Sequence, residues 1–147
     1  MARIIGIDSR GARGQSAGDA VMVLVDTSVW IHAFANRTPF VSGLDRLLNL
    51  DQVVGHQLVY GELLIGDRGG RKKVLEAYEQ IQQASSVPHD EVVAFVRARR
   101  LFGRGIGWID THLLASAVVD RLQVWTADPR FATAAQELGV AYAMPSV

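Results

Sequence analysis

Short apolar runs alternate along this chain with segments in which apolar residues recur at helical spacing. Residues 21–26 and 122–126 are nearly continuous apolar runs, typical of strands buried on both faces of a parallel sheet. Residues 52–54 predict a weaker strand, and we expect short strands at 86–88 and 140–142.

Helical spacing of apolar residues fills the segments between these strands. A Gly-rich stretch at 103–107 predicts a loop, and Pro129 suits the first position of a helix. Strands that alternate with helices indicate an α/β fold with a parallel sheet. The predicted helices cover residues 29–34, 44–50, 58–65, 71–84, 92–101, 110–122 and 129–138.

Residues 1–21 differ from the rest of the chain. They contain four Gly and three Arg residues and show little hydrophobic periodicity. We expect a flexible N-terminal extension followed by one domain at 22–147. The alternative is a basic arm that contacts a nucleic acid or a protein partner.

Composition narrows the class of protein. A chain of 147 residues that is 49% hydrophobic fits one domain with a sizeable core. The 15 basic and 15 acidic residues give no net charge that would point to nucleic acid, and the absence of Cys excludes disulfides, thiolate zinc sites and a Cys nucleophile. Because no run approaches the ~20 apolar residues of a membrane span and no secretory signal is evident, we expect a cytoplasmic protein.

Four acids lie directly beside the predicted core: Asp26, Glu62, Asp110 and Asp128. Asp26 and Asp128 each follow the end of a predicted strand, and parallel strands end at one edge of a sheet. Two carboxylates at ~4 Å repel by about 4 kcal/mol at an effective dielectric of 20. If all four converge, a divalent cation is the simplest partner, and oxygen ligands favour Mg²⁺, with Mn²⁺ as a substitute.

Each acid also has a structural interpretation. Asp26, Asp110 and Asp128 stand where they could be N-caps of the following helices. Glu62 could be an exposed residue at the edge of an apolar helix face. Neighbouring hydroxyls carry the same ambiguity, because they can orient a carboxylate or metal-bound water, or serve ordinary capping and strand formation. These are Thr27, Ser28 and Thr126.

Four segments around the acids resemble the motifs of PIN-domain ribonucleases. They are Leu24-Val-Asp-Thr-Ser-Val-Trp-Ile31, Gly61-Glu-Leu-Leu-Ile-Gly66, Ile109-Asp-Thr-His-Leu-Leu-Ala-Ser-Ala117 and Val124-Trp-Thr-Ala-Asp-Pro-Arg-Phe131. Their order and the size of the chain resemble the small VapC toxins of bacterial toxin–antitoxin pairs. The resemblance covers residues 22 to about 142, and residues 1–21 are additional, since these toxins usually begin at the first strand.

The resemblance implies a three-layer, Rossmann-like PIN fold with a mainly parallel central sheet flanked by helices. It also implies a Mg²⁺-dependent endoribonuclease that cleaves RNA with activated water. It implies that Asp26 and Asp110 bind the ion directly, whereas Glu62 and Asp128 act through water or on a second ion. It also implies a cognate VapB-like antitoxin and a homodimer. Apolar residues on the first helices could serve either contact, although burial in the monomer is the default interpretation; these are Ile31, Phe34, Phe40 and Val41. The RNA and its cleavage sequence stay open.

RNA needs cations around an acidic pocket. One candidate cluster is Arg97, Arg99, Arg100 and Arg104, joined by Arg130 next to the last motif; a second is Arg68, Arg71, Lys72 and Lys73. The alternative is solvated helix faces. Trp30, Trp108 and Phe131 could stack on bases, although core packing suits Trp30 and Phe131 better. The four His residues show no metal-ligand spacing and are interpreted as structural or surface residues, with His112 nearest to an acid.

Three competing functions fit less well. A phosphate-receiver domain needs a Lys near the site after a later strand, and this chain has none beyond Lys73. A haloacid-type phosphatase needs Asp-x-Asp after the first strand, where this chain has Asp26-Thr-Ser. A non-catalytic PIN module that binds RNA or protein usually lacks part of the acidic quartet, which is complete here.

Overall fold

The structure, a computed structural model, describes residues 20–145. Most of the predicted N-terminal extension therefore lies outside the described residues. Along the described chain the elements are β1 (Val23–Val25), α2 (Thr27–Phe34), α3 (Phe40–Asn49), β2 (Val53–Val54), α4 (Gln57–Ile65), α5 (Lys72–Tyr78), α6 (His89–Arg99), α7 (Trp108–Asp120), β3 (Gln123–Trp125) and α8 (Pro129–Glu137). No helix in this part of the chain has the length and apolar composition needed to cross a membrane.

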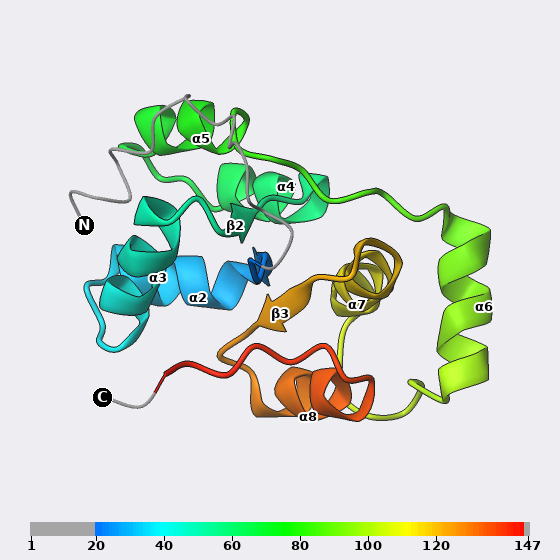
Figure 1. Cartoon of the computed structure of the whole chain (residues 1–147). Coiled ribbons are helices and arrows are strands. Elements are labelled where there is room, and N and C mark those ends of the chain that lie inside the picture. The colour runs from blue at the N-terminus through cyan, green and yellow to red at the C-terminus, as the bar shows by residue number, and fades with distance from the viewer. Residues whose placement is uncertain (1–19, 146–147) are drawn as a thin grey trace.

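A parallel three-stranded sheet in the order β2-β1-β3 forms the central layer. Helices α2 and α3 lie on one side of it, and α7 and α6 lie on the other (Figure 1). All residues of β1 and β2 are buried, which agrees with the continuous apolar runs in the sequence. The three-layer α/β prediction is thus confirmed.

The register of the sheet brings two sequence-distant segments together. Val25 pairs with Trp125, so the chain leaves β1 and β3 at the same edge. Asp26 follows directly, and Asp26 N–H donates a hydrogen bond to Trp125 O at 2.9 Å. The residues that precede α2 and α8 therefore lie together at the edge where the strands have their carboxyl ends.

The core contains the largest aromatic side chains. Trp30 and Phe131 are fully buried, so their expected core packing is confirmed and neither can stack on a base. Trp30 packs edge-on against Tyr78, with ring centroids 5.4 Å apart. Trp108, by contrast, is 44% exposed.

Two predicted elements differ from the structure. Residues 86–88 form no strand, and the predicted helix at 71–84 ends at Tyr78. The reason is a competing backbone pairing: Gly55 N–H donates to Gln82 O, and Ala84 N–H donates to Gly55 O. Residues 82–84 therefore extend the sheet edge and do not continue the helix. Residues 140–142 contribute only an isolated bridge between Ala141 and Val124.

Candidate active site

The four acids come from four different elements. Asp26 connects β1 to α2, and Asp128 precedes α8. Asp110 lies in the first turn of α7, and Glu62 lies near the end of α4. The fold therefore has to bring together side chains that are far apart in the sequence.

Hydroxyl groups hold the buried carboxylate of Asp26. Only 6% of this residue is exposed, and its Oδ2 accepts hydrogen bonds from Ser28 Oγ (2.7 Å) and Thr126 Oγ1 (2.9 Å). Ser28 Oγ accepts from Ala127 N–H, and Thr126 Oγ1 accepts from Asp128 N–H, both at 3.0 Å. Neutral donors thus fix the Asp26 side chain relative to the backbone before Asp128.

Thr27 links Glu62 to the start of α2. Thr27 Oγ1 donates to Glu62 Oε1 at 2.6 Å, which connects α2 to α4. Glu62 is half-buried, so it is not the exposed edge residue of the structural interpretation. The hydroxyls of Thr27, Ser28 and Thr126 all contact acids of the quartet.

Capping explains one of the four acids in full. Asp128 is the N-cap of α8, because its Oδ1 accepts from Arg130 N–H at 2.9 Å. Asp26 occupies an N-cap position, but its side chain makes no capping bond. Asp110 is not the N-cap of α7: Gly107 is, and Asp110 Oδ2 accepts from Gly107 N–H at 2.9 Å.

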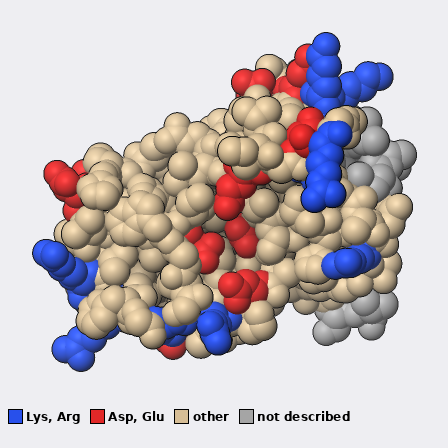
Figure 2. Space-filling model, turned by 180° about the vertical axis from the view of Figure 1, so that it is seen from behind, with Lys and Arg blue, Asp and Glu red and all other residues tan. Residues whose placement is uncertain are grey.

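The charges of the other three acids reach the carboxyl group of Asp110. The pKa of Asp110 is raised from 3.8 to about 6, chiefly because burial disfavours its charged form. The hydrogen bond from Gly107 opposes this rise in pKa, whereas the negative charges of Asp26, Asp128 and Glu62 add to it. Acidic side chains gather in a hollow near the middle of one face (Figure 2).

No Lys or Arg among residues 20–145 forms an ion pair with any of the four acids. Arg104 is paired with Glu137 on α8 at 2.6 Å, and Arg97, Arg99 and Arg100 are exposed at the end of α6. The Arg130 side chain covers Gly105, where an added Cβ would lie 2.5 Å from Arg130 Nη1. The negative charge of the hollow is therefore left without a protein counter-ion in the described chain.

This donor set fits a hard, well-hydrated cation. Carboxylate and hydroxyl oxygens are the groups that Mg²⁺ and Mn²⁺ accept. Within the described ranges, no three acidic or His side chains are grouped closely enough to chelate an ion together. An ion held by one or two carboxylates would keep several water ligands, as Mg²⁺ usually does.

The His residues stay outside this group. His56 is buried at the N-cap of α4, where Nδ1 accepts from Leu58 N–H and Nε2 lies 3.1 Å from Ser116 Oγ. His112 packs edge-on against Trp108, with centroids 5.0 Å apart. Burial and the nearby His89 lower the pKa of His112.

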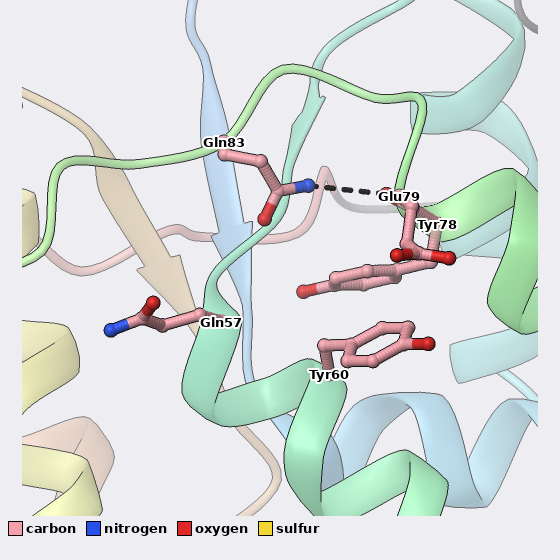
Figure 3. A pocket seen from close by; sticks show the side chains of 5 residues that line it. All are labelled: Gln57, Tyr60, Tyr78, Glu79 and Gln83. Atoms are coloured by element: carbon pink, nitrogen blue, oxygen red, sulfur yellow. Dashed lines mark hydrogen bonds between the residues drawn. The ribbon is translucent and has the colours of Figure 1, made fainter.

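A second hollow of about 220 Å³ contains none of the four acids. It is lined by Gln57, Tyr60, Tyr78, Glu79 and Gln83. Figure 3 shows the Tyr78 ring above the Tyr60 ring, with the Gln83 amide above both. Gln83 Nε2 donates to Tyr78 O and Ile81 O, both at 3.1 Å, which holds this amide in place. Without a nucleophile or paired acids, this hollow is a weaker candidate for catalysis.

Phe102, for which no role was predicted from the sequence, is 64% exposed in the loop between α6 and α7. A usable signal was present, because an aromatic residue stood between Arg100 and Arg104 in a Gly-rich stretch. Exposure itself could not be predicted, since Leu101 beside it is buried.

Comparison with known proteins places the chain in a family. The model of the PIN domain family matches residues 23–137. Ribonuclease VapC32 of Mycobacterium tuberculosis is 44% identical over 124 residues, which cover 83% of this chain and 97% of that protein.

Solved structures agree with this assignment. The crystal structure of FitAcB from Neisseria gonorrhoeae has a TM-score of 0.57 and 27% identity, covering 82% of this chain and 95% of that one. FitAB bound to the IR36 DNA fragment has the same TM-score at 25% identity, covering 82% and 92%. The four motifs, the parallel sheet and these matches lead to one conclusion: this chain belongs to the PIN-domain family and, within it, to the VapC ribonucleases.

Proposed function

We propose that this protein is a divalent-metal-dependent endoribonuclease that acts as the toxin of a toxin–antitoxin pair. The observation that supports the proposal is that the charges of Asp26, Asp128 and Glu62 all add to the pKa of Asp110, which burial chiefly raises to about 6, while no described Lys or Arg forms an ion pair with any of the four acids. A group of acids without a cationic partner favours a bound cation, and a divalent cation would suit phosphodiester cleavage. The similarity to ribonuclease VapC32 supports RNA as the substrate.

In this proposal Asp26 and Asp110 hold the ion, and Mg²⁺ is the expected metal. A bound ion would supply charge neutralisation at the phosphate and lower the pKa of a coordinated water. Ser28 and Thr126 hold Oδ2 of Asp26, and both hydrogen bonds that the described residues give this side chain end on that atom. Oδ1 is therefore the oxygen that Asp26 offers to a cation.

Glu62 and Asp128 orient the attacking water. Thr27 occupies Glu62 Oε1, which leaves Oε2 as the oxygen that can accept a hydrogen bond from water. Asp128 uses Oδ1 to cap α8, so Oδ2 is its oxygen for the site. A second ion held by these two carboxylates would also stabilise the negative charge that develops on the leaving oxygen.

Arginines at the margin bind the RNA backbone. Figure 2 shows Lys and Arg side chains below the acidic hollow and at the edge of the same face. Arg130 follows Asp128 closely and lies over Gly105, which makes it the cation of the set best placed for a phosphate next to the site. Arg104, held by Glu137, and the exposed Arg97, Arg99 and Arg100 extend this surface.

A ribonuclease toxin also needs a partner that inhibits its activity. We propose a cognate VapB-like antitoxin and a homodimer, both acting in the cytoplasm where the RNA is. Ile31 is 41% exposed and available for a partner, whereas Phe34, Phe40 and Val41 are partly buried against the core. The complete quartet favours this enzyme over a non-catalytic RNA- or protein-binding PIN module.

The test combines variants with chelation. Asp26→Ala and Asp110→Ala should abolish RNA cleavage, and Asp67→Asn should leave it unchanged, because Asp67 lies outside the quartet and Asn keeps the hydrogen bond from Gly69 N–H. EDTA should stop cleavage, and Mg²⁺ or Mn²⁺ should restore it. Mapping 5′ ends of cellular RNA after expression of wild type and Asp26→Ala would identify the substrate. Cleavage that survives both quartet substitutions would refute the assigned site.

A further inference from the structure

The loop between α6 and α7 holds a large aromatic side chain out in solvent. Phe102 is 64% exposed, although Leu101 before it is 3% exposed and packs in the core. Single exposed apolar residues are common, and Val119 at 60% is another on this protein. Phe102 differs from Val119 in three ways. It is aromatic, it stands between Arg100 and Arg104 in the sequence, and its loop is held in place by hydrogen bonds to other elements.

This loop is fixed at several points next to the acidic hollow. Arg104 makes two parallel hydrogen bonds to the Glu137 carboxylate, at 2.6 and 2.9 Å. Gly105, at φ +79°, lies against the Arg130 side chain, and Gly107 N–H donates to Asp110. The loop is therefore pre-organised by contacts that include one acid and one cation of the candidate site.

Cations lead from α6 into the loop. Arg97 and Arg99 lie in the last turn of α6, and Arg100 ends the helix in the left-handed conformation at φ +54°. All three are exposed. On the face that carries the acids, basic side chains stand at the edge where α6 ends and beneath the acidic hollow, over α8 (Figure 2).

We propose that Phe102 is a stacking platform for an unpaired base of the RNA substrate. Grooves for single-stranded nucleic acid combine cations that follow the phosphates with aromatic faces for the bases. The five residue-to-residue steps from Phe102 to Gly107 span at most about 18 Å when fully extended, so the stacked base is only a few nucleotides from the cleaved bond. This proposal rests on the proposed ribonuclease function and adds that the substrate is single-stranded on the α6 side.

Phe102 is a positioning residue in this proposal, because it touches no reacting atom. Removing it should weaken binding without slowing the chemical step, so KM should rise while kcat stays the same. A base paired in a duplex offers no free face for the ring, so the effect should be confined to single strands.

The experiment measures binding and cleavage separately. Fluorescence anisotropy in EDTA gives the Kd of a single-stranded oligoribonucleotide and of a duplex of equal length, for wild type, Phe102→Ala, Phe102→Leu and Phe102→Trp. We expect Phe102→Ala to raise the single-strand Kd about tenfold. Phe102→Trp should restore wild-type binding, Phe102→Leu should not, and the duplex Kd should stay constant. Val119→Ala is the matched control for loss of an exposed apolar side chain.

Two failures are distinguishable. If wild type cleaves RNA and Phe102→Ala binds it equally well, the stacking proposal is overturned and the ribonuclease proposal stands. The same holds if Phe102→Leu binds like wild type. If wild type neither binds nor cleaves RNA, both proposals fall together.

Discussion

Replacing Asp110 with Asn should make the metal-free protein more stable while it destroys activity. The carboxyl of Asp110 has a pKa of about 6 in the folded chain against an ordinary value of 3.8. An acid with a raised folded-state pKa favours folding when protonated, so its stabilising effect is complete below about pH 4 and is lost as pH rises through about 6. At neutral pH the ionised group costs up to about 3 kcal/mol of folding free energy.

Asn removes the charge and keeps the hydrogen bond, because its amide oxygen can accept from Gly107 N–H as Asp110 Oδ2 does. Allowing for solvent screening at this partly exposed residue, we expect a gain of about 1–2 kcal/mol at pH 7.5. For a domain of this size that raises Tm by at least about 2–4 °C. Differential scanning calorimetry in EDTA measures the shift.

Three controls isolate the cause. The stability difference between Asp110→Asn and wild type should vanish below pH 4, where both side chains are neutral. Asp67→Asn should leave Tm unchanged, because Asp67 does not add to the charge around Asp110. Added Mg²⁺ should stabilise wild type more than Asp110→Asn. An Asp110→Asn protein that is no more stable than wild type in EDTA at pH 7.5 would refute the electrostatic reasoning.

Three further outcomes are expected. Burial lowers the pKa of His56 from 6.5 to about 4, so the free energy of unfolding should fall by up to about 3 kcal/mol as pH falls through this range. His56→Asn can still cap α4 and should remove this pH dependence, which urea titrations between pH 7 and 4 would measure. Gly105→Ala should destabilise the protein by about 1–3 kcal/mol, since its φ of +79° and the Arg130 side chain leave no room for a methyl group; an unchanged urea midpoint would show that the loop adapts. Deleting residues 1–21 should leave the rate of RNA cleavage unchanged, and a slower rate would assign the extension a function.

The parts of the site closest to strand ends were predictable from sequence. Asp26 and Asp128 each follow an apolar run, and parallel strands must end at one edge, so their approach follows from topology. The N-cap role of Asp128 also follows from the local pattern with Pro129. Such features depend on a few neighbouring residues, which the sequence displays directly.

Other parts depend on tertiary structure. Glu62 reaches the start of α2 because α4 packs against α2, where Thr27 Oγ1 donates to Glu62 Oε1, and no local sequence pattern specifies that packing. The predicted helix at 71–84 is cut short because Gly55 pairs with residues 82–84, a contact across about thirty residues of sequence. Asp110 was a candidate N-cap because the helix was predicted to begin just after it. The helix begins two residues earlier, at Trp108, so Asp110 lies inside its first turn.

The acids of this site are oriented by neutral donors, namely Ser28, Thr126, Thr27 and backbone N–H groups. Because no described Lys or Arg pairs with these acids, replacing one of them with its amide should remove the proposed RNA cleavage without breaking an ion pair. A copy of the chain inactivated in this way would keep its outer surface and go on occupying any protein that recognises it. Such a copy would act as a decoy that competes with active molecules for the proposed antitoxin.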